Sequence, residues 1–268
     1  MILILLSFSV YQNFISPAQI PLYTLSNGEK TLRFQTMSHV ASPEFYSLVQ
    51  NNIRTSKQED FILFFEGVRP GSDESIETFN GALGIDFGPD LYSNFSKLYG
   101  IVSQDNDDFL NIVNNLDFNV DLDLDTVVEK YEAKQESLGV EASQEQKIPD
   151  EVLDINSEII TMLAELNPRE LTAVRFLNQA IMNFMIKNEG LRNILIDTLG
   201  NTDIFGVILD DRNEYLVQEI LTSDFDKIHI LYGLMHFDGV FKLLQQNDTN
   251  WEIIETEYSQ VIVQDFGL

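Results

Sequence analysis

The sequence predicts an α/β fold: a mixed central sheet flanked by helices, with a helical insertion. Three observations predict it. Short apolar runs, such as 61–65 and 228–232, are followed by polar residues and then by helical spacing. Two apolar runs around Asn27-Gly28 predict a hairpin, which adds an antiparallel strand. Long helical patterns fill most of roughly 88–205, so a largely parallel core sheet brackets a helical middle.

Length and composition fit this fold. The 268 residues allow one or two domains, and 44% of them are hydrophobic, which is ordinary for a globular protein. We expect a single domain over 1–268, in which the insertion at about 88–205 covers the sheet. Because the chain has no cysteine, disulfides and thiolate chemistry are excluded.

The charge balance is strongly acidic. Sixteen Lys and Arg stand against 43 Asp and Glu, a formal net charge of -27. Nucleic acid is therefore excluded as a partner, because phosphate binding needs clustered cations. An anionic membrane surface is disfavoured for the same reason. Solubility in salt and cation binding both fit the excess of acid.

The first eleven residues, MILILLSFSVY, are apolar. They fall far short of the roughly 20 that span a bilayer, and they lack the basic leader of a secretory signal. We expect a first element docked on the fold. The alternative is the remnant of an anchor, with N-terminal membrane association. The location is then cytoplasmic in the first case and membrane-anchored or extracytoplasmic in the second.

The first half of the chain alternates strand and helix signals. The hairpin 20–37 is expected to turn through a type I′ turn at Asn27-Gly28. Ser42-Pro43-Glu44 has the pattern of an N-cap, a first-turn proline and a first-turn acid, and it predicts a helix to about Asn52. An apolar strand then ends at Glu66, and a helix is expected over about 89–104.

The second half contains the longer helices. NVDLDLDTVVEKYEAKQ changes from alternation to helical spacing, and 135–150 is polar enough to be an exposed connection. Helices are predicted over about 151–166, 168–188 and 191–199. IFGVIL predicts a short strand that leads through Asp210 and Asp211 to Arg212 and a helix. KIHILYG predicts a strand ending at Gly233, and WEIIETEYSQVIVQDF predicts closing strands.

Four predicted strand ends carry polar side chains: His39, Glu66, Arg212 and His236. Ligands of α/β sheets gather at the carboxyl ends of the strands. His236 precedes a helix, whose N-terminus disfavours the imidazolium, and neutral imidazole binds metals or accepts protons. Two histidines and a carboxylate are the donors of a divalent-metal site with room for water.

Structural roles are the alternative at each position. Histidines at strand ends are commonly hydrogen-bonded linkers, Glu66 could be a solvated strand terminus, and Arg212 could be an ion-pair partner. His229 lies inside a strand, where packing is expected. Acids at 121, 123, 125 and 132 match calcium-loop positions 1, 3, 5 and 12, but position 6 is Thr126 instead of glycine. A strand that leads into a helix is the better interpretation there.

The four motifs in order resemble the TraB family, which includes the TraB pheromone-shutdown proteins and the Tiki proteases, within a superfamily with ChaN and the erythromycin esterases. The resemblance rests on TMSHVASPEFY, FFEGV, DDRNEYLVQEI and YGLMHFDGVFKLL, and NVDLDLD is similar to a further family segment. It covers about 32–244. Each motif alone is weak, and their order makes them specific. Thr36 departs from the family by replacing the expected glycine before His39.

The resemblance implies a ChaN/erythromycin-esterase-like fold and, in the Tiki branch, a peptidase that depends on a divalent cation (Mn, Co or Zn). His39, His236 and Glu66 would then be the metal ligands. Glu66 would also act on the metal-bound water, and Arg212 would stabilise negative charge. A peptide or small molecule would be the substrate. The TraB branch implies instead a non-catalytic protein that sequesters a peptide, and the esterases imply a metal-free hydrolase. All three stay open at this point.

Overall fold

The computed structural model describes residues 2–83, 91–104, 112–137, 155–191 and 202–264. Within them the chain is an α/β protein with a mixed six-stranded sheet and ten α-helices. The strands are β1 Gln19–Ser26, β2 Thr31–Met37, β3 Val40–Ala41, β4 Ile62–Phe65, β5 Val102–Ser103, β6 Phe118–Asn119, β7 Lys227–Gly233 and β8 Glu252–Gln260. The α-helices are α1 Ile2–Val10, α2 Pro43–Gln58, α3 Asp73–Leu83, α4 Leu91–Tyr99, α6 Leu124–Ser137, α7 Ile155–Glu165, α8 Pro168–Lys187, α10 Thr202–Gly206, α11 Arg212–Thr222 and α12 Phe237–Asn247.

The sheet has the order β6-β4-β7-β2-β1-β8. The first four strands run parallel to one another, and β1 runs antiparallel to both β2 and β8. The central strand β7 is buried along most of its length, as expected of a parallel strand covered on both faces. The predicted mixed sheet is confirmed.

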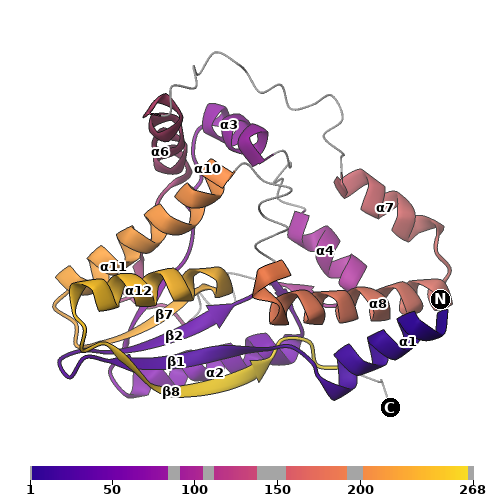
Figure 1. Ribbon diagram of the computed structural model, residues 1–268, viewed down its shortest axis with the longest axis horizontal. Helices are drawn as coiled ribbons and strands as arrows, with labels where there is room; N and C mark the ends of the chain where they lie inside the picture. Colours follow the sequence, from indigo (N-terminus) through magenta and orange to yellow (C-terminus); the bar gives the residue numbers. More distant parts are fainter. Residues whose placement is uncertain (1, 84–90, 105–111, 138–154, 192–201, 265–268) are drawn as a thin grey trace.

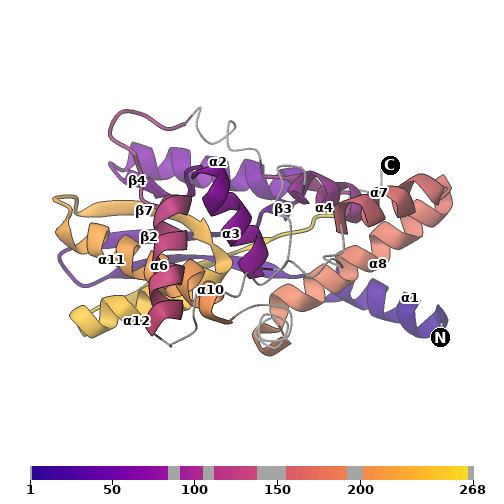
Figure 2. The ribbon, with the colours of Figure 1, turned by 90° about the horizontal axis from the view of Figure 1, so that it is seen from above.

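Helices cover both faces of the sheet. Figure 2 shows α2 on one side of the strands and α11 with α12 on the other. The core on the α11/α12 face joins those helices to β2 and β7. It includes Leu32, Phe34, Leu216, Ile220, Ile228, Ile230, Tyr232, Leu244 and Trp251. The core on the α2 face is built around Phe45, Val49, Ile53, Leu63 and Leu231. Two apolar layers therefore fix the strands in position.

The hairpin forms as predicted, but its turn is different. Ser26 pairs with Thr31, so four residues connect the strands, and among them only Gly28 has a positive φ, +91°. A type I′ turn needs positive φ at two central residues, so that expectation is wrong. The Asn27 side chain explains the longer loop, because its Oδ1 accepts hydrogen bonds from the backbone N–H groups of Glu29 and Lys30.

One predicted strand is wrong. The run IFGVIL lies in a continuous helical segment made of α10, a π-helix η2 Val207–Asp211, and α11. Its apolar side chains pack against other helices and not against the sheet. Ile204 and Val207 are buried against side chains of α3 and α6. A short apolar run without flanking breakers fits either element, which explains the error.

The middle of the chain contains α4, α6, α7 and α8, and also the short strands β5 and β6. β6 pairs in parallel with β4, so this region contributes the outer strand of the sheet. Helix α3 was not predicted from the sequence. The predicted connection at 135–150 and the predicted helix at 191–199 fall largely outside the described residues.

The N-terminal segment is a helix, α1, which continues into a π-helix η1 Tyr11–Ile15. Figure 1 shows it at one end of the molecule, beside α8. No helix among the described residues combines the length and apolar character needed to cross a membrane.

His229 is a buried histidine of β7, 1% exposed, as expected for a packing role. Its Nδ1 lies 2.8 Å from Ser56 Oγ, and its Nε2 has no hydrogen-bond partner in the structure. Burial, followed by the nearby charges of Arg33 and Lys57, lowers the pKa of His229 to about 3. The folded protein therefore keeps this ring neutral.

This pKa predicts a loss of stability in acid. The unfolded chain takes up a proton on residue 229 below its ordinary pKa of 6.5, whereas the folded chain does so only near 3. The free energy of unfolding should therefore fall as the pH drops through this window. Between pH 7 and pH 5 the His229→Gln variant should lose about 2 kcal/mol less stability than the wild type, measured by urea unfolding. Equal losses in both proteins would contradict a neutral buried His229.

Candidate functional site

The carboxyl ends of the four parallel strands meet at one edge of the sheet. β2 is in register with β7, with Met37 opposite Gly233, and β4 is in register with β7, with Phe65 opposite Leu231. The residues that follow each strand therefore lie side by side across the sheet. In strand order they are Asp121, Glu66, His236 and His39.

Glu66 lies at the centre of this edge. Its Oε2 accepts a hydrogen bond of 2.6 Å from the backbone N–H of Gly233, the residue that ends β7. A Cβ at position 233 would lie 3.3 Å from Glu66 Oε2, which is a tight contact. The absence of a side chain at Gly233 therefore gives the carboxylate room beside the strand end. A short 3-10 turn, Leu234–His236, then returns His236 towards Glu66.

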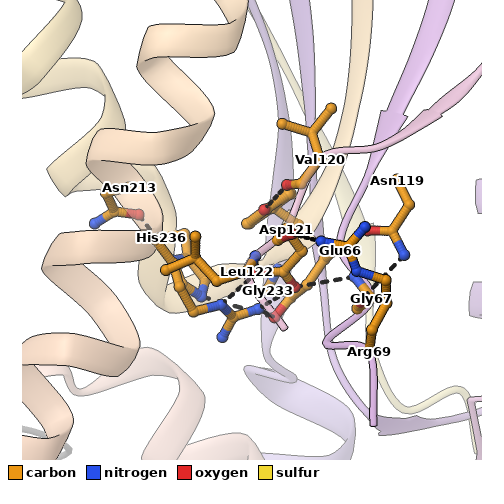
Figure 3. Close-up of polar contacts among 12 residues, drawn as sticks. Glu66, Gly67, Arg69, Asn119, Val120, Asp121, Leu122, Asn213, Gly233 and His236 are labelled. Carbon is orange, nitrogen blue, oxygen red and sulfur yellow. Dashed lines mark hydrogen bonds and ion pairs between the residues drawn. The ribbon is translucent and has the colours of Figure 1, made fainter. Parts of the chain in front are cut away.

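Arg212 joins Glu66 to Asp121. Its Nη2 donates to Glu66 Oε1 at 2.6 Å and to Asp121 Oδ2 at 2.7 Å, while its Nε donates to Asp121 Oδ1 at 2.8 Å. Figure 3 shows Asp121 and Glu66 turned towards the same point between the strand ends. Asp121 is fully buried and Arg212 is 5% exposed, so this is a buried ion-pair network.

Arg212 does not follow a strand, which corrects the sequence expectation. It is the first residue of α11, directly after the π-helix η2. A π-turn contains more residues than an α-turn and is frequent at functional sites. The predicted strand before Arg212 is therefore wrong, and the role of Arg212 itself stays a prediction.

The charges of this network are mutually dependent. Burial raises the pKa of Glu66, but the Arg212 guanidinium, the two imidazoles and the Gly233 N–H together lower it below its ordinary value. Burial raises the pKa of Asp121 in spite of the Arg212 hydrogen bonds. Burial opposes the charge of Arg212, but both carboxylates raise its pKa overall, so it stays a cation. Glu66 is therefore ionised at neutral pH.

His236 is buried, 3% exposed, and its Nδ1 lies 2.8 Å from Asn213 Oδ1. An amide oxygen only accepts, so Nδ1 carries the proton and Nε2 carries the lone pair. Nε2 lies 3.7 Å from Glu66 Oε1. Burial lowers the pKa of His236 to about 4, although Glu66 acts in the opposite direction. The ring is thus neutral, and its unprotonated nitrogen faces the carboxylate.

His39 follows β2 and is exposed at the same edge. Its ring stacks on Tyr92 of α4, with centroids 4.6 Å apart. Desolvation by the surrounding protein lowers the pKa of His39, with Glu66 and Arg212 acting in opposite directions. Thr36, where the resemblance to the TraB family expects a glycine, donates from Oγ1 to the Pro21 carbonyl of β1. All four predicted residues are therefore within electrostatic reach of one another.

Asp121, Asn213 and Tyr92 are contributors to the site that were not predicted as such. Asp121 was considered as a calcium ligand, yet its oxygens bind Arg212, Gly67 N and Leu122 N. Asp123 accepts from Thr126 N and Asp125 accepts from Ser72, so the acids of this segment are used as structural acceptors. The sequence does contain a pattern that could have identified Asp121: this acid lies between two apolar residues shortly after a strand.

The arrangement does not fit a divalent cation as it stands. The 3.7 Å between His236 Nε2 and Glu66 Oε1 suits two ligands of one ion at ~2.1 Å each. However, Glu66 Oε1 already receives the Arg212 guanidinium and Oε2 receives Gly233 N–H. Across the described ranges, no group of three or more His, Cys, Asp or Glu is arranged to hold a metal. The metal set His39, Glu66 and His236 stays a prediction.

A cavity of about 260 Å³ adjoins Glu66. Most of its lining is apolar, from Leu63, Phe65, Val68, Pro70, Val113 and Leu231. Arg69, Gln104 and Asn119 supply polar groups, and Arg69 is more than half exposed. A site with an apolar pocket and a few convergent polar groups is typical of small-ligand binding.

Fold and site thus define an α/β protein with a charged cluster at the carboxyl edge of its sheet. Comparisons with family models, with curated proteins and with solved structures each found no significant match.

The buried network predicts a large cost for removing Asp121. Asp121→Ala should lower the free energy of unfolding by about 3–5 kcal/mol, because it leaves Arg212 buried with a lost partner. Asp211→Ala is the matched control, since Asp211 makes a 2.7 Å ion pair with Lys130 at the surface. That change should cost about 0–1 kcal/mol. Urea unfolding at neutral pH measures both, and equal effects would contradict the network's role.

The contact between Asn213 and Gly239 gives a second prediction. A Cβ at position 239 would lie 2.3 Å from Asn213 Nδ2. Gly239→Ala should therefore displace the amide from His236 and destabilise the protein, although Gly→Ala in a helix normally stabilises by about 1 kcal/mol. Gly190→Ala is the control, because Gly190 lies in a helical stretch just after α8 and nothing lies within 4 Å of its Cβ position. The two variants should shift the melting temperature in opposite directions.

Proposed function

We propose that the protein is a TraB/Tiki-like hydrolase, with a ChaN/erythromycin-esterase-like single domain, that cleaves a peptide or small-molecule substrate at the cluster of His39, Glu66, Arg212 and His236. The observation that best supports this is the state of His236. Its Nδ1 proton is fixed by Asn213, and its unprotonated Nε2 faces Glu66 from 3.7 Å. A fixed tautomer with a free basic nitrogen is what proton abstraction from water requires.

The charges of Glu66 and Arg212 suit the two charges that form during hydrolysis, a cation on His236 and an anion on the attacked carbonyl. When His236 Nε2 accepts a proton from water, the ionised Glu66 beside it stabilises the imidazolium. Arg212 uses Nε and Nη2 on the carboxylates, and its Nη1 makes no hydrogen bond to any described residue. That nitrogen is free to donate to the oxyanion that forms when a carbonyl is attacked.

The cavity beside Glu66 supports a substrate with a bulky apolar group. Its volume of about 260 Å³ suits one large side chain, and its lining is mainly apolar. Arg69 at the same cavity carries a positive charge that is only loosely paired, 3.8 Å from Asp123. A peptide whose apolar residue enters the cavity is therefore our preferred substrate class.

A cation-dependent form of the same hydrolysis is a second proposal. It is supported by the neutral state of His236 and by the distance between its Nε2 and Glu66 Oε1. It requires Glu66 to exchange Arg212 for the metal. A non-catalytic protein that sequesters a peptide at this cluster is the third.

The purified protein should cleave members of a mixed peptide library, read by mass spectrometry, with preference for bulky apolar residues. Glu66→Gln and His236→Ala should each reduce turnover by about 10²-fold or more, because each removes a group of the proton-transfer pair. Glu59→Gln, at a surface ion pair with Arg33, is the matched control and should leave turnover unchanged.

Chelation separates the alternatives. Turnover that persists in excess chelator supports the metal-free reaction. Turnover that is lost and then restored by Mn²⁺ supports the cation-dependent reaction. Saturable peptide binding without product, unchanged by Glu66→Gln, would replace the enzyme proposal with sequestration.

A further inference from the structure

The N-terminal helical segment exposes an unusual amount of apolar surface. The side chains of Ile2, Leu3 and Ile4 are 80%, 77% and 73% exposed. The apolar N-terminal surface comprises these three together with Leu5, Leu6, Val10, Tyr11, Phe14 and Ile15. Contiguous exposed apolar surface of this kind marks an interaction site.

This surface is held in a fixed orientation. The Phe8 ring packs edge-on against Phe184 of α8, with centroids 5.7 Å apart. Asn13 is 1% exposed; its Nδ2 donates to the Phe176 carbonyl at 2.8 Å, and its Oδ1 accepts from Asn183 at 3.0 Å. One side of the segment is thus anchored by buried polar contacts. Both ribbon views show α1 beside α8 at the extreme end of the molecule.

Charge distinguishes between the possible occupants. Residues 1–28 contain no Asp, Glu, Lys, Arg or His, although the chain carries a net charge of -27. An uncharged surface of zwitterionic lipid is compatible with this segment. Anionic lipid would be repelled by the rest of the chain, and so would a second copy with the same charge.

Length sets the depth of insertion. Residues 2–15 extend about 21 Å at ~1.5 Å per residue, less than the ~30 Å hydrocarbon core of a bilayer. The segment is therefore able to enter one leaflet without crossing it. The exposed fraction is greatest at the first residues of α1, so this end would enter first.

We propose that residues 2–15 are a docking surface for a neutral, zwitterionic phospholipid membrane, with the N-terminal turns of α1 inserted into one leaflet. The hydrocarbon takes up the exposed Ile and Leu side chains, and the contacts with α8 fix the position of the sheet relative to the lipid surface. The proposal is independent of the catalytic one.

Flotation with phosphatidylcholine vesicles tests it on the full chain. The wild type should float with the vesicles, and 1 M NaCl should not release it, because the interaction is apolar. Replacing one fifth of the lipid by phosphatidylglycerol should weaken binding. The double variant Leu3→Ser, Ile4→Ser should bind at least tenfold less, while its melting temperature stays unchanged because both side chains are exposed.

The matched control is Ile253→Ser, Ile254→Ser, which removes two exposed apolar side chains of β8. It should float like the wild type. Flotation equal in wild type and the Leu3/Ile4 variant, or no flotation of the wild type, overturns the proposal. A wild-type dimer in solution that this variant dissociates, without flotation, assigns the surface to a second copy instead.

Discussion

The arrangement of the candidate site depends on one buried cation. Arg212 lies between Glu66 and Asp121 and donates three hydrogen bonds to them, and all three side chains are mostly or wholly removed from water. Burying a guanidinium costs several kcal/mol, which only well-oriented partners offset. The two carboxylates in turn would repel each other without it. Each member therefore requires the others in place.

The mutual requirement of Arg212, Glu66 and Asp121 follows from the topology of the sheet. Glu66 and Asp121 follow the adjacent parallel strands β4 and β6, so their carboxylates point to the same edge. Arg212 arrives from a helix that packs on the face of the sheet opposite to α2. Charge pairing across these elements fixes α11 against the strand ends. It also orients Glu66 towards His236, so the same contacts that maintain the fold set the geometry of the reactive groups.

Part of the candidate site could be predicted from the sequence, and whether a residue could be found depended on the pattern around it. Glu66 and His236 were found because continuous apolar strands end visibly at them, and parallel strand ends converge. Asp121 was missed as a site residue because its alternation with Val120 and Leu122 also fits an ordinary strand edge. Asn213 lies beside Arg212 in the motif DDRNEYLVQEI, but the motif does not specify its role, which depends on a hydrogen bond to a ring 23 positions away.

The error at 204–209 has a different physical origin. Five apolar residues around Gly206 fit a strand or a buried helix equally well by periodicity. Tertiary packing selects the helix, because Ile204 and Val207 pack against α3 and α6. The turn at Asn27 was misjudged because side-chain hydrogen bonds selected a longer loop than the dipeptide alone suggests.

The π-helix η2 has a consequence for changes in chain length. In an α-helix each residue advances the side-chain direction by about 100°. The π-helix holds one residue more per turn than an α-helix. Deleting one residue from Val207–Asp211 would therefore let this segment close as a regular α-helix, with Arg212 still facing its carboxylates. A deletion within α11 has no such extra residue to remove and would rotate the side chains that follow it by about 100°, so it should be far less tolerated than a deletion within the π-helix.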